Sequence, residues 1–109
     1  MIRLSALRSK YYAIPTMIDG IRFDSKREAA RYGELRLLER LGEITDLRCQ
    51  PRYELAVLGM RLGEYRADFA YTRHGQVQCE DVKGFDTPLS RWKRKHVQAQ
   101  YGIAVQVLR

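Results

Sequence analysis

The order of local patterns along this chain of 109 residues predicts an α/β fold, a mixed central β-sheet with a helix on each face. Two segments, 25–41 and 88–101, have the periodicity and the terminal signals of helices. Strand-favouring runs lie between and after them, and the hairpin pattern at 65–84 is the clearest. The length suits one modest core, so we expect residues 1–109 to form a single domain.

The N-terminal region leads into the first helix. Residues 1–10 carry basic side chains with little periodicity, which predicts either a basic arm that follows a DNA backbone or a frayed terminus. Residues 11–17 favour extended structure. Asp19 and Gly20 then predict a tight turn into an extended run at 21–23.

The first helix begins with the pattern of a capping box. Ser25 can accept a backbone hydrogen bond while the Glu28 carboxylate reaches back, and Gly42 supplies the residue that ends such a helix. On a helical wheel Glu28 borders the apolar arc and Glu34 lies inside it, so either carboxylate can look toward the sheet. Capping alone would explain Glu28. An exposed or ion-paired side chain is the ordinary explanation of Glu34.

The middle and the end of the chain supply the remaining strands. Residues 43–48 form a short connection, and Gln50 leads into a predicted strand at 52–57. The two glycines in 58–64 predict a turn that delivers the chain to the hairpin. A strongly strand-favouring run at 103–108 completes the sheet.

The hairpin brings two acidic residues together. A two-residue turn at His74 and Gly75 places Asp68 directly opposite Asp81. Facing carboxylates repel each other and destabilise a sheet unless a positive charge lies between them, and a divalent cation with oxygen ligands is suitable. Strand alternation puts Lys83 on the same face as Asp81. Two carboxylates and an ammonium group are therefore expected to converge.

Glu80 is the alternative acidic residue of the second hairpin strand. Alternation directs Glu80 to the face opposite Asp81, so Asp81 is the preferred ligand, although a bulge would reverse this. The structural alternative for the whole hairpin is an ordinary surface sheet, in which Arg66 and Lys83 neutralise the acids.

This combination of charges suits the hydrolysis of phosphodiesters. A bound cation polarises a phosphoryl oxygen and lowers the pKa of a bound water. An adjacent ammonium group stabilises the negative charge that grows in the transition state.

The second helix has clear ends and two kinds of surface. Thr87 and Pro88 suit its first turn, and Gly102 suits its end. An apolar stripe is expected to pack on the sheet and consists of Leu89, Trp92, His96 and Ala99. A run of basic residues is predicted to form a positive surface that contacts backbone phosphates, and it consists of Arg91, Lys93, Arg94 and Lys95. Lys93 is the best candidate for a contact near the scissile phosphate, although a charge run is usually just a solvated helix face.

Charge and hydropathy limit the classes of function. Basic residues number 20 against 13 acidic ones, which gives a net charge of +7 and favours a polyanionic partner such as DNA. No apolar run approaches the roughly 20 residues that span a bilayer, so we expect a cytoplasmic protein. Cys49 and Cys79 are isolated in the sequence, which predicts reduced thiols and no zinc site.

The acidic spacing also resembles a known superfamily. Asp68, twelve intervening residues and then Asp81-x-Lys83 are similar to the signature of the PD-(D/E)xK nucleases. The segments ADFAY and EDVKG resemble more particularly the small phage and prophage proteins of the DUF1064 group. That similarity extends from about Ile18 to the C-terminus and takes in GIRFDSKREA, ELRLLERLGEI and QP.

The resemblance implies a restriction-endonuclease-like core and a role for each acidic residue. Asp68 and Asp81 would bind Mg²⁺ or Mn²⁺, Glu28 would be the third acidic group, and Lys83 would stabilise charge or position water. Glu34 and Glu80 would be auxiliary at most. Gln50 matches a polar position that either orients a ligand or caps the backbone.

The resemblance further implies a metal-dependent DNA endonuclease of a bacterial host cell, encoded by a phage or prophage. Small basic members of the superfamily often act as homodimers on branched DNA, so a Holliday-junction nuclease in recombination or replication is the preferred subtype. One alternative is a non-catalytic nucleic-acid-binding domain that uses the basic helix alone. Another is a nuclease subunit of a restriction or transposition system that needs a partner.

Overall fold

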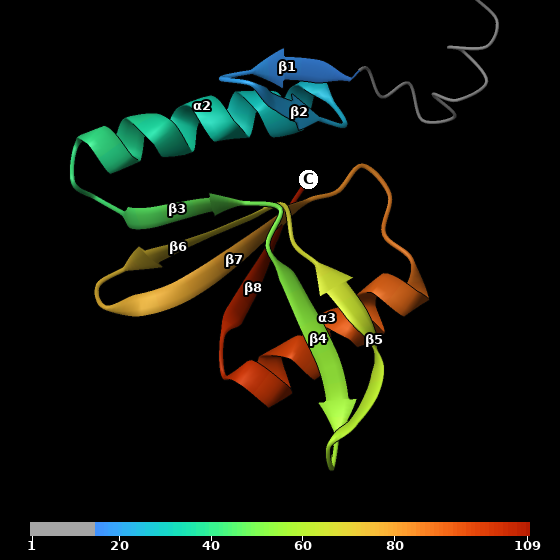
Figure 1. The fold of residues 1–109 in the computed structure, drawn as a ribbon. Coiled ribbons are helices and arrows are strands. Elements are labelled where there is room, and N and C mark those ends of the chain that lie inside the picture. Colours follow the sequence, from blue (N-terminus) through green and yellow to red (C-terminus); the bar gives the residue numbers. More distant parts are fainter. Residues whose placement is uncertain (1–14) are drawn as a thin grey trace, which may run out of the picture. The chain divides into compact units, whose positions relative to one another are not determined.

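The computed structural model describes residues 15–109 and has the mixed α/β composition that the sequence predicts (Figure 1). The chain divides into two compact units, Met1–Glu34 and Leu35–Arg109. The predicted basic arm at 1–10 and most of the extended run at 11–17 lie outside the described residues. The placement of one helix on each face of the sheet stays a prediction.

The first unit contains a small hairpin. β1 (Thr16–Ile18) pairs antiparallel with β2 (Ile21–Phe23). Asp19 and Gly20 form the predicted turn, with φ of 53° and 76°. Both values lie in the left-handed region that a two-residue hairpin turn requires.

Helix α2 (Lys26–Arg40) begins in this unit, at the predicted cap. The Glu28 N–H donates to Oγ of Ser25 at 3.1 Å, which is the capping bond expected of Ser25. Tyr32 donates its hydroxyl hydrogen to Asp19 Oδ2 at 2.8 Å, so the helix is tied to the β1–β2 turn.

The end of α2 shows why Gly42 stops the helix. The Gly42 N–H donates to the carbonyl of Glu39 at 3.1 Å, and the Glu43 N–H donates to that of Leu38 at 2.9 Å. These two bonds form a Schellman motif, which needs a left-handed residue, and Gly42 has φ of 79°.

The second unit holds a four-stranded mixed sheet in the order β3-β6-β7-β8 (Figure 1). The first two pairings are antiparallel and the last is parallel. The strands are β3 (Thr45–Cys49), β6 (Phe69–Arg73), β7 (Gln76–Val82) and β8 (Ala104–Leu108).

The β6–β7 hairpin confirms the predicted turn and register. His74 and Gly75 have φ of 52° and 76°, as a tight reversal requires. Phe69 pairs with Glu80 and the register is uninterrupted to the turn. No bulge therefore reverses the faces of β7.

The turn predicted over residues 58–64 is wrong, because most of this segment is a strand. β4 (Arg52–Val57) and β5 (Met60–Arg66) form a separate two-stranded sheet, and only Leu58 and Gly59 make the turn. Gly63 signalled a turn in the sequence, but it lies beside a register shift in the ladder, where a glycine is common.

Helix α3 (Pro88–Tyr101) has the predicted ends, and it contacts β4, β5 and β8. Thr87 accepts the Ser90 N–H at 3.0 Å, and the Gly102 N–H donates to the Gln98 carbonyl at 3.0 Å. Neither helix in the described part of the chain has the length and apolarity that crossing a bilayer requires.

The apolar stripe predicted for α3 is wrong, because the buried side of the helix carries other residues than expected. Leu89 and Trp92 are 61% and 50% exposed, and the buried positions of the helix are Arg94 and Val97. Val97 belongs to the core cluster of this unit, whose other members are Leu55, Tyr65, Ala67, Ala70 and Cys79.

Candidate active site

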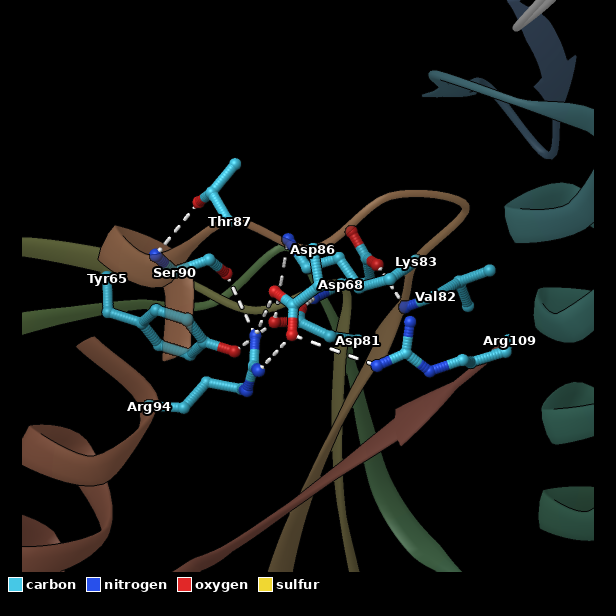
Figure 2. Close-up of polar contacts among 10 residues, drawn as sticks. All are labelled: Tyr65, Asp68, Asp81, Val82, Lys83, Asp86, Thr87, Ser90, Arg94 and Arg109. Carbon is cyan, nitrogen blue, oxygen red and sulfur yellow. Dashed lines mark hydrogen bonds and ion pairs between the residues drawn. The ribbon is translucent and has the colours of Figure 1, made fainter. Parts of the chain in front are cut away.

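Two aspartates lie together at one end of the β6–β7 hairpin (Figure 2). The Asp68 N–H donates to Asp81 Oδ1 at 3.1 Å, and the Val82 N–H donates to Asp68 Oδ2 at 2.7 Å. Each carboxylate therefore accepts a hydrogen bond from the opposite chain segment. The predicted juxtaposition of Asp68 and Asp81 is confirmed.

Burial raises the pKa of Asp68 to about 6. The Val82 N–H opposes this shift by stabilising the carboxylate, and the charge of Asp81 adds to it. The positive charges of Lys83 and Arg66 act in the lowering direction but do not cancel the effect of burial. The folded protein thus holds a carboxylate at Asp68 that is easily protonated.

Asp81 is only 1% exposed and is held by Tyr65 of β5, whose hydroxyl donates to Asp81 Oδ2 (Figure 2). Burial raises the pKa of Tyr65, and its hydrogen bond to Asp81 raises it further, so the phenol remains a donor. Sequence reasoning missed Tyr65. Its place in β5 depends on the strand that was mistaken for a turn.

Lys83 lies on the same side of the sheet as Asp81, as predicted. Its Nζ is 4.0 Å from Asp81 Oδ2, and its side chain is 28% exposed. The Lys83 N–H donates to the carbonyl of Leu108 in β8 at 2.8 Å, which fixes the backbone from which the side chain extends.

Glu80 points away from this site. It is fully buried, and the Tyr71 hydroxyl donates to its Oε2 at 2.5 Å. Because the hairpin register contains no bulge, Glu80 and Asp81 remain on opposite faces. The predicted placement of Glu80 and Asp81 on opposite faces is confirmed, and the choice of Asp81 as metal ligand stays a prediction.

Gln50 lies next to Asp68 through its backbone. The Gln50 N–H donates to the Asp68 carbonyl at 2.8 Å, and the Ala67 N–H donates to the Pro51 carbonyl at 3.1 Å. This backbone bond helps to hold Asp68 in place, and the two roles expected of the Gln50 side chain stay predictions.

A pocket of about 210 Å³ opens beside Lys83. Lys93 reaches it from α3 and Arg66 reaches it from β5, so three cations surround one space. The other lining residues are Glu64, Tyr65, Thr87, Leu89 and Ser90. Glu64 is the single acid among them and forms ion pairs with Arg52 and Arg61. The pocket therefore has an excess of positive charge suited to a phosphate group.

Arg94 does not belong to the exposed positive surface, which corrects the expectation that it contacts phosphates there. It is 8% exposed, and its guanidinium donates to both oxygens of Asp86 at 3.0 and 2.6 Å (Figure 2). These hydrogen bonds lower the pKa of Asp86 to about 2. A helical charge run gives no sign of which member turns inward. Arg91 and Lys95 are exposed and Lys93 is half-buried at the pocket.

Comparison with protein families found one that covers most of the chain. Its model, described as a protein of unknown function (DUF1064), matches residues 8–107. The chain belongs to this family. The match begins before Ile18, where the sequence resemblance to DUF1064 was expected to start.

Comparisons with curated proteins and with solved structures found no match for this DUF1064 chain. Membership of the PD-(D/E)xK superfamily stays a prediction.

The expected third acidic residue belongs to the other unit of the DUF1064 chain. Glu28 lies in the first turn of α2, and its role as a metal ligand stays a prediction. Glu34 is also in that unit and forms an ion pair with Arg31 at 2.9 Å, which is its ordinary structural explanation.

The donor set of the DUF1064 site consists of two carboxylates, which is fewer than a metal site held by protein side chains alone requires. Among residues 15–109, no group of three or more His, Cys, Asp or Glu side chains is arranged to hold a metal. Magnesium is commonly bound by one or two carboxylates, with waters and substrate phosphate completing its shell. Asp68 and Asp81 supply carboxylates of this kind, and the adjoining pocket has room for a phosphate.

Proposed function

We propose that this DUF1064 protein is a divalent-metal-dependent endodeoxyribonuclease of the PD-(D/E)xK type. The observation that carries the proposal is the approach of Asp68, Asp81 and Lys83 at the end of one hairpin, beside a cationic pocket. The net charge of +7 favours DNA as the partner.

Asp68 and Asp81 would hold a magnesium ion through their carboxylate oxygens. When bound, the ion would supply electrophilic activation of a phosphodiester and an acidic water. Tyr65 and the backbone N–H groups of Asp68 and Val82 fix the directions of these oxygens. The two carboxylates are thus positioned before any ligand arrives, which is what an electrostatically organised site requires.

Lys83 and the other cations of the pocket would bind the phosphates of the substrate. The Lys83 ammonium stands next to Asp81 and can stabilise charge on a phosphate oxygen or position a water. Lys93 and Arg66 line the same pocket and would hold the phosphate backbone in register.

A purely structural hairpin does not account for Asp68. An asparagine at this position would accept the same hydrogen bond from Val82 without an ionisable group. The aspartate instead has a pKa raised to about 6 by burial, so its charged form costs more free energy in the folded protein than in water, although it still predominates at pH 7. A bound cation would offset the free-energy cost of charging this buried carboxylate. A cation site of this kind favours an enzyme over a domain that only binds nucleic acid.

The finer expectations belong to the same proposal. Branched DNA such as a Holliday junction is the preferred substrate, phage recombination or replication is the setting, and a homodimer is the acting form. A restriction or transposition subunit would share the site and differ in needing a partner protein before it cuts.

The test is cleavage of linear, nicked, flapped and four-way DNA with magnesium, with EDTA as the metal-free control. We expect Asp81→Asn and Asp68→Asn to abolish magnesium-dependent cutting. Asp46→Asn is the matched control, because Asp46 is exposed in β3 and its φ of 53° is one that asparagine accepts readily. Equal cutting by wild type and Asp81→Asn would refute the site. Tight DNA binding without cutting of any substrate would favour the non-catalytic reading.

A further inference from the structure

Two large apolar side chains of α3 are exposed beside the cationic pocket. Leu89 and Trp92 were expected in the core, yet both lie at the surface. Leu89 also lines the pocket with Lys93. Positions 89, 92, 93 and 96 follow one stripe of a helix, so Trp92 lies along the same side of α3 as the pocket residues.

The Trp92 side chain packs against a neighbouring ring of α3. Its ring centroid is 5.5 Å from that of His96, with the planes at 47°. His96 Nε2 lies 3.2 Å from the carbonyl oxygen of Ala56 in β4, so the His96 ring contacts both Trp92 and the β4–β5 hairpin. An exposed indole with a fixed neighbour loses little side-chain freedom when a flat partner stacks on it.

The surroundings of Trp92 are positive. Helix α3 carries four basic residues and no acidic one. Arg94 is neutralised by Asp86, which leaves three cations within three residues of Trp92 along the helix: Arg91, Lys93 and Lys95. A protein-docking patch is usually depleted of lysine at its centre. An aromatic ring among cations is instead the usual arrangement for single-stranded nucleic acid, where bases stack on rings and phosphates meet the charges.

We infer that Trp92, with Leu89 beside it, stacks against an unpaired DNA base while the pocket of Lys83 and Lys93 takes an adjacent phosphate. The inference rests on the proposed function, since it names the DNA segment that would reach Asp68 and Asp81. In a duplex both faces of a base are covered by its neighbours, so only an unpaired base offers its face to the indole. The substrate class is therefore DNA with a single-stranded segment next to the cut, such as a flap or an open branch.

The test uses Trp92 as its own probe, because it is the single tryptophan of the chain. The full-length Asp81→Asn variant is titrated in EDTA with a single strand of about 12 nucleotides, a length within the usual site size. The same strand annealed to its complement is the comparison. We expect saturable quenching of the indole fluorescence by the single strand and much weaker quenching by the duplex.

Affinity measured with labelled DNA supplies the second readout. Trp92→Ala should weaken single-strand binding by about 5- to 150-fold, the range for loss of one stacked base, and should change duplex binding little. Trp92→Phe should restore most of the affinity. Met60→Ala is the matched control, because Met60 is also a large exposed apolar residue but lies on β5, outside the α3 stripe.

Unchanged fluorescence on saturation with the single strand would overturn the inference. An equal loss of affinity for both DNA forms in Trp92→Ala would overturn it too. These outcomes are separate from those of the cleavage test, since no metal or turnover is involved. Quenching by a wild-type protein that never cuts DNA would refute the proposed nuclease and support stacking of an unpaired base on Trp92. DNA cutting by the wild type, with no effect of Trp92→Ala on single-strand affinity, would support the nuclease and refute the stacking.

Discussion

Asp68 and Asp81 are joined by a hydrogen bond of 3.1 Å from the backbone N–H of Asp68 to Oδ1 of Asp81. The same N–H lies 3.1 Å from the carbonyl oxygen of Glu80, so it is shared between the strand ladder and the side chain. The two acidic residues are thus fixed by the backbone that brings them together. Their mutual repulsion is tolerated because N–H groups and Lys83 lie around them.

The raised pKa of Asp68 predicts a pH-dependent cost in stability. Its pKa is about 6 in the folded protein against an ordinary 3.8, so the folded state binds more protons between these values. The contribution of this group to stability is therefore present below about pH 4 and is lost as the pH rises through about 6. Asp68→Asn should raise the free energy of unfolding at pH 7.5 by roughly 1–3 kcal/mol and change it little at pH 4.

Urea unfolding at the two pH values, without divalent metal, measures this difference. Asp46→Asn, which removes an exposed carboxylate of β3, is the control for the substitution itself. A destabilised Asp68→Asn at pH 7.5 would mean that the charged carboxylate is favourable where it stands.

Magnesium binding should depend on pH through the same group. The ion needs Asp68 deprotonated, so binding near pH 5 should release a proton and be weak, whereas binding at pH 7.5 should be stronger. A ligand that binds only the folded state raises the unfolding temperature. We expect millimolar Mg²⁺ to raise it at pH 7.5 and far less at pH 5. Asp81→Asn should remove the shift at both pH values. A shift that is independent of pH would exclude Asp68 as a ligand.

Lys83 and Lys93 line one pocket but should differ in their kinetic effects. Lys83→Met should lower the single-turnover cleavage rate by about 100- to 1000-fold with a smaller effect on DNA affinity, since Lys83 acts on transition-state charge in the proposed mechanism. Lys93→Met should weaken binding and lower the slope of log affinity against log salt by about 1, since Lys93 holds a phosphate in the proposed site. Identical profiles for the two variants would mean that Lys83 is only another phosphate contact.

Much of the second unit was predictable because its signals are local. The turn at His74 and Gly75 fixed the hairpin register, and the register placed Asp68 opposite Asp81. The ends of α3 followed from Thr87 and Gly102 in the same way. Each of these features depends on backbone conformations that few residues adopt.

The missed features depend on contacts between distant segments. Tyr65 reaches Asp81 only because β5 is a strand. That strand was not predicted, because Gly63 is a turn signal in the sequence. The apolar stripe of α3 was misplaced because Arg94 turns inward to meet Asp86, and a buried ion pair has no periodic signature in the sequence. Periodicity reports apolar faces, so a charged residue at a core position shifts the predicted face of the helix.

Arg94 should therefore behave as a structural residue, unlike its neighbours on α3. It donates two hydrogen bonds to Asp86 and a third to Ser90 Oγ at 2.8 Å, which ties the loop after Lys83 to the helix. A lysine cannot make this bidentate contact, so Arg94→Lys should lower the unfolding temperature by several degrees. Arg91→Lys on the exposed face is the matched control and should leave the unfolding temperature unchanged.

Because the Arg94–Asp86 pair holds the pKa of Asp86 near 2, the stabilising effect of this pair should fade as the pH drops from about 4 toward 2. An Arg94→Lys protein as stable as wild type at pH 7, with reduced DNA affinity, would instead place Arg94 among the phosphate contacts.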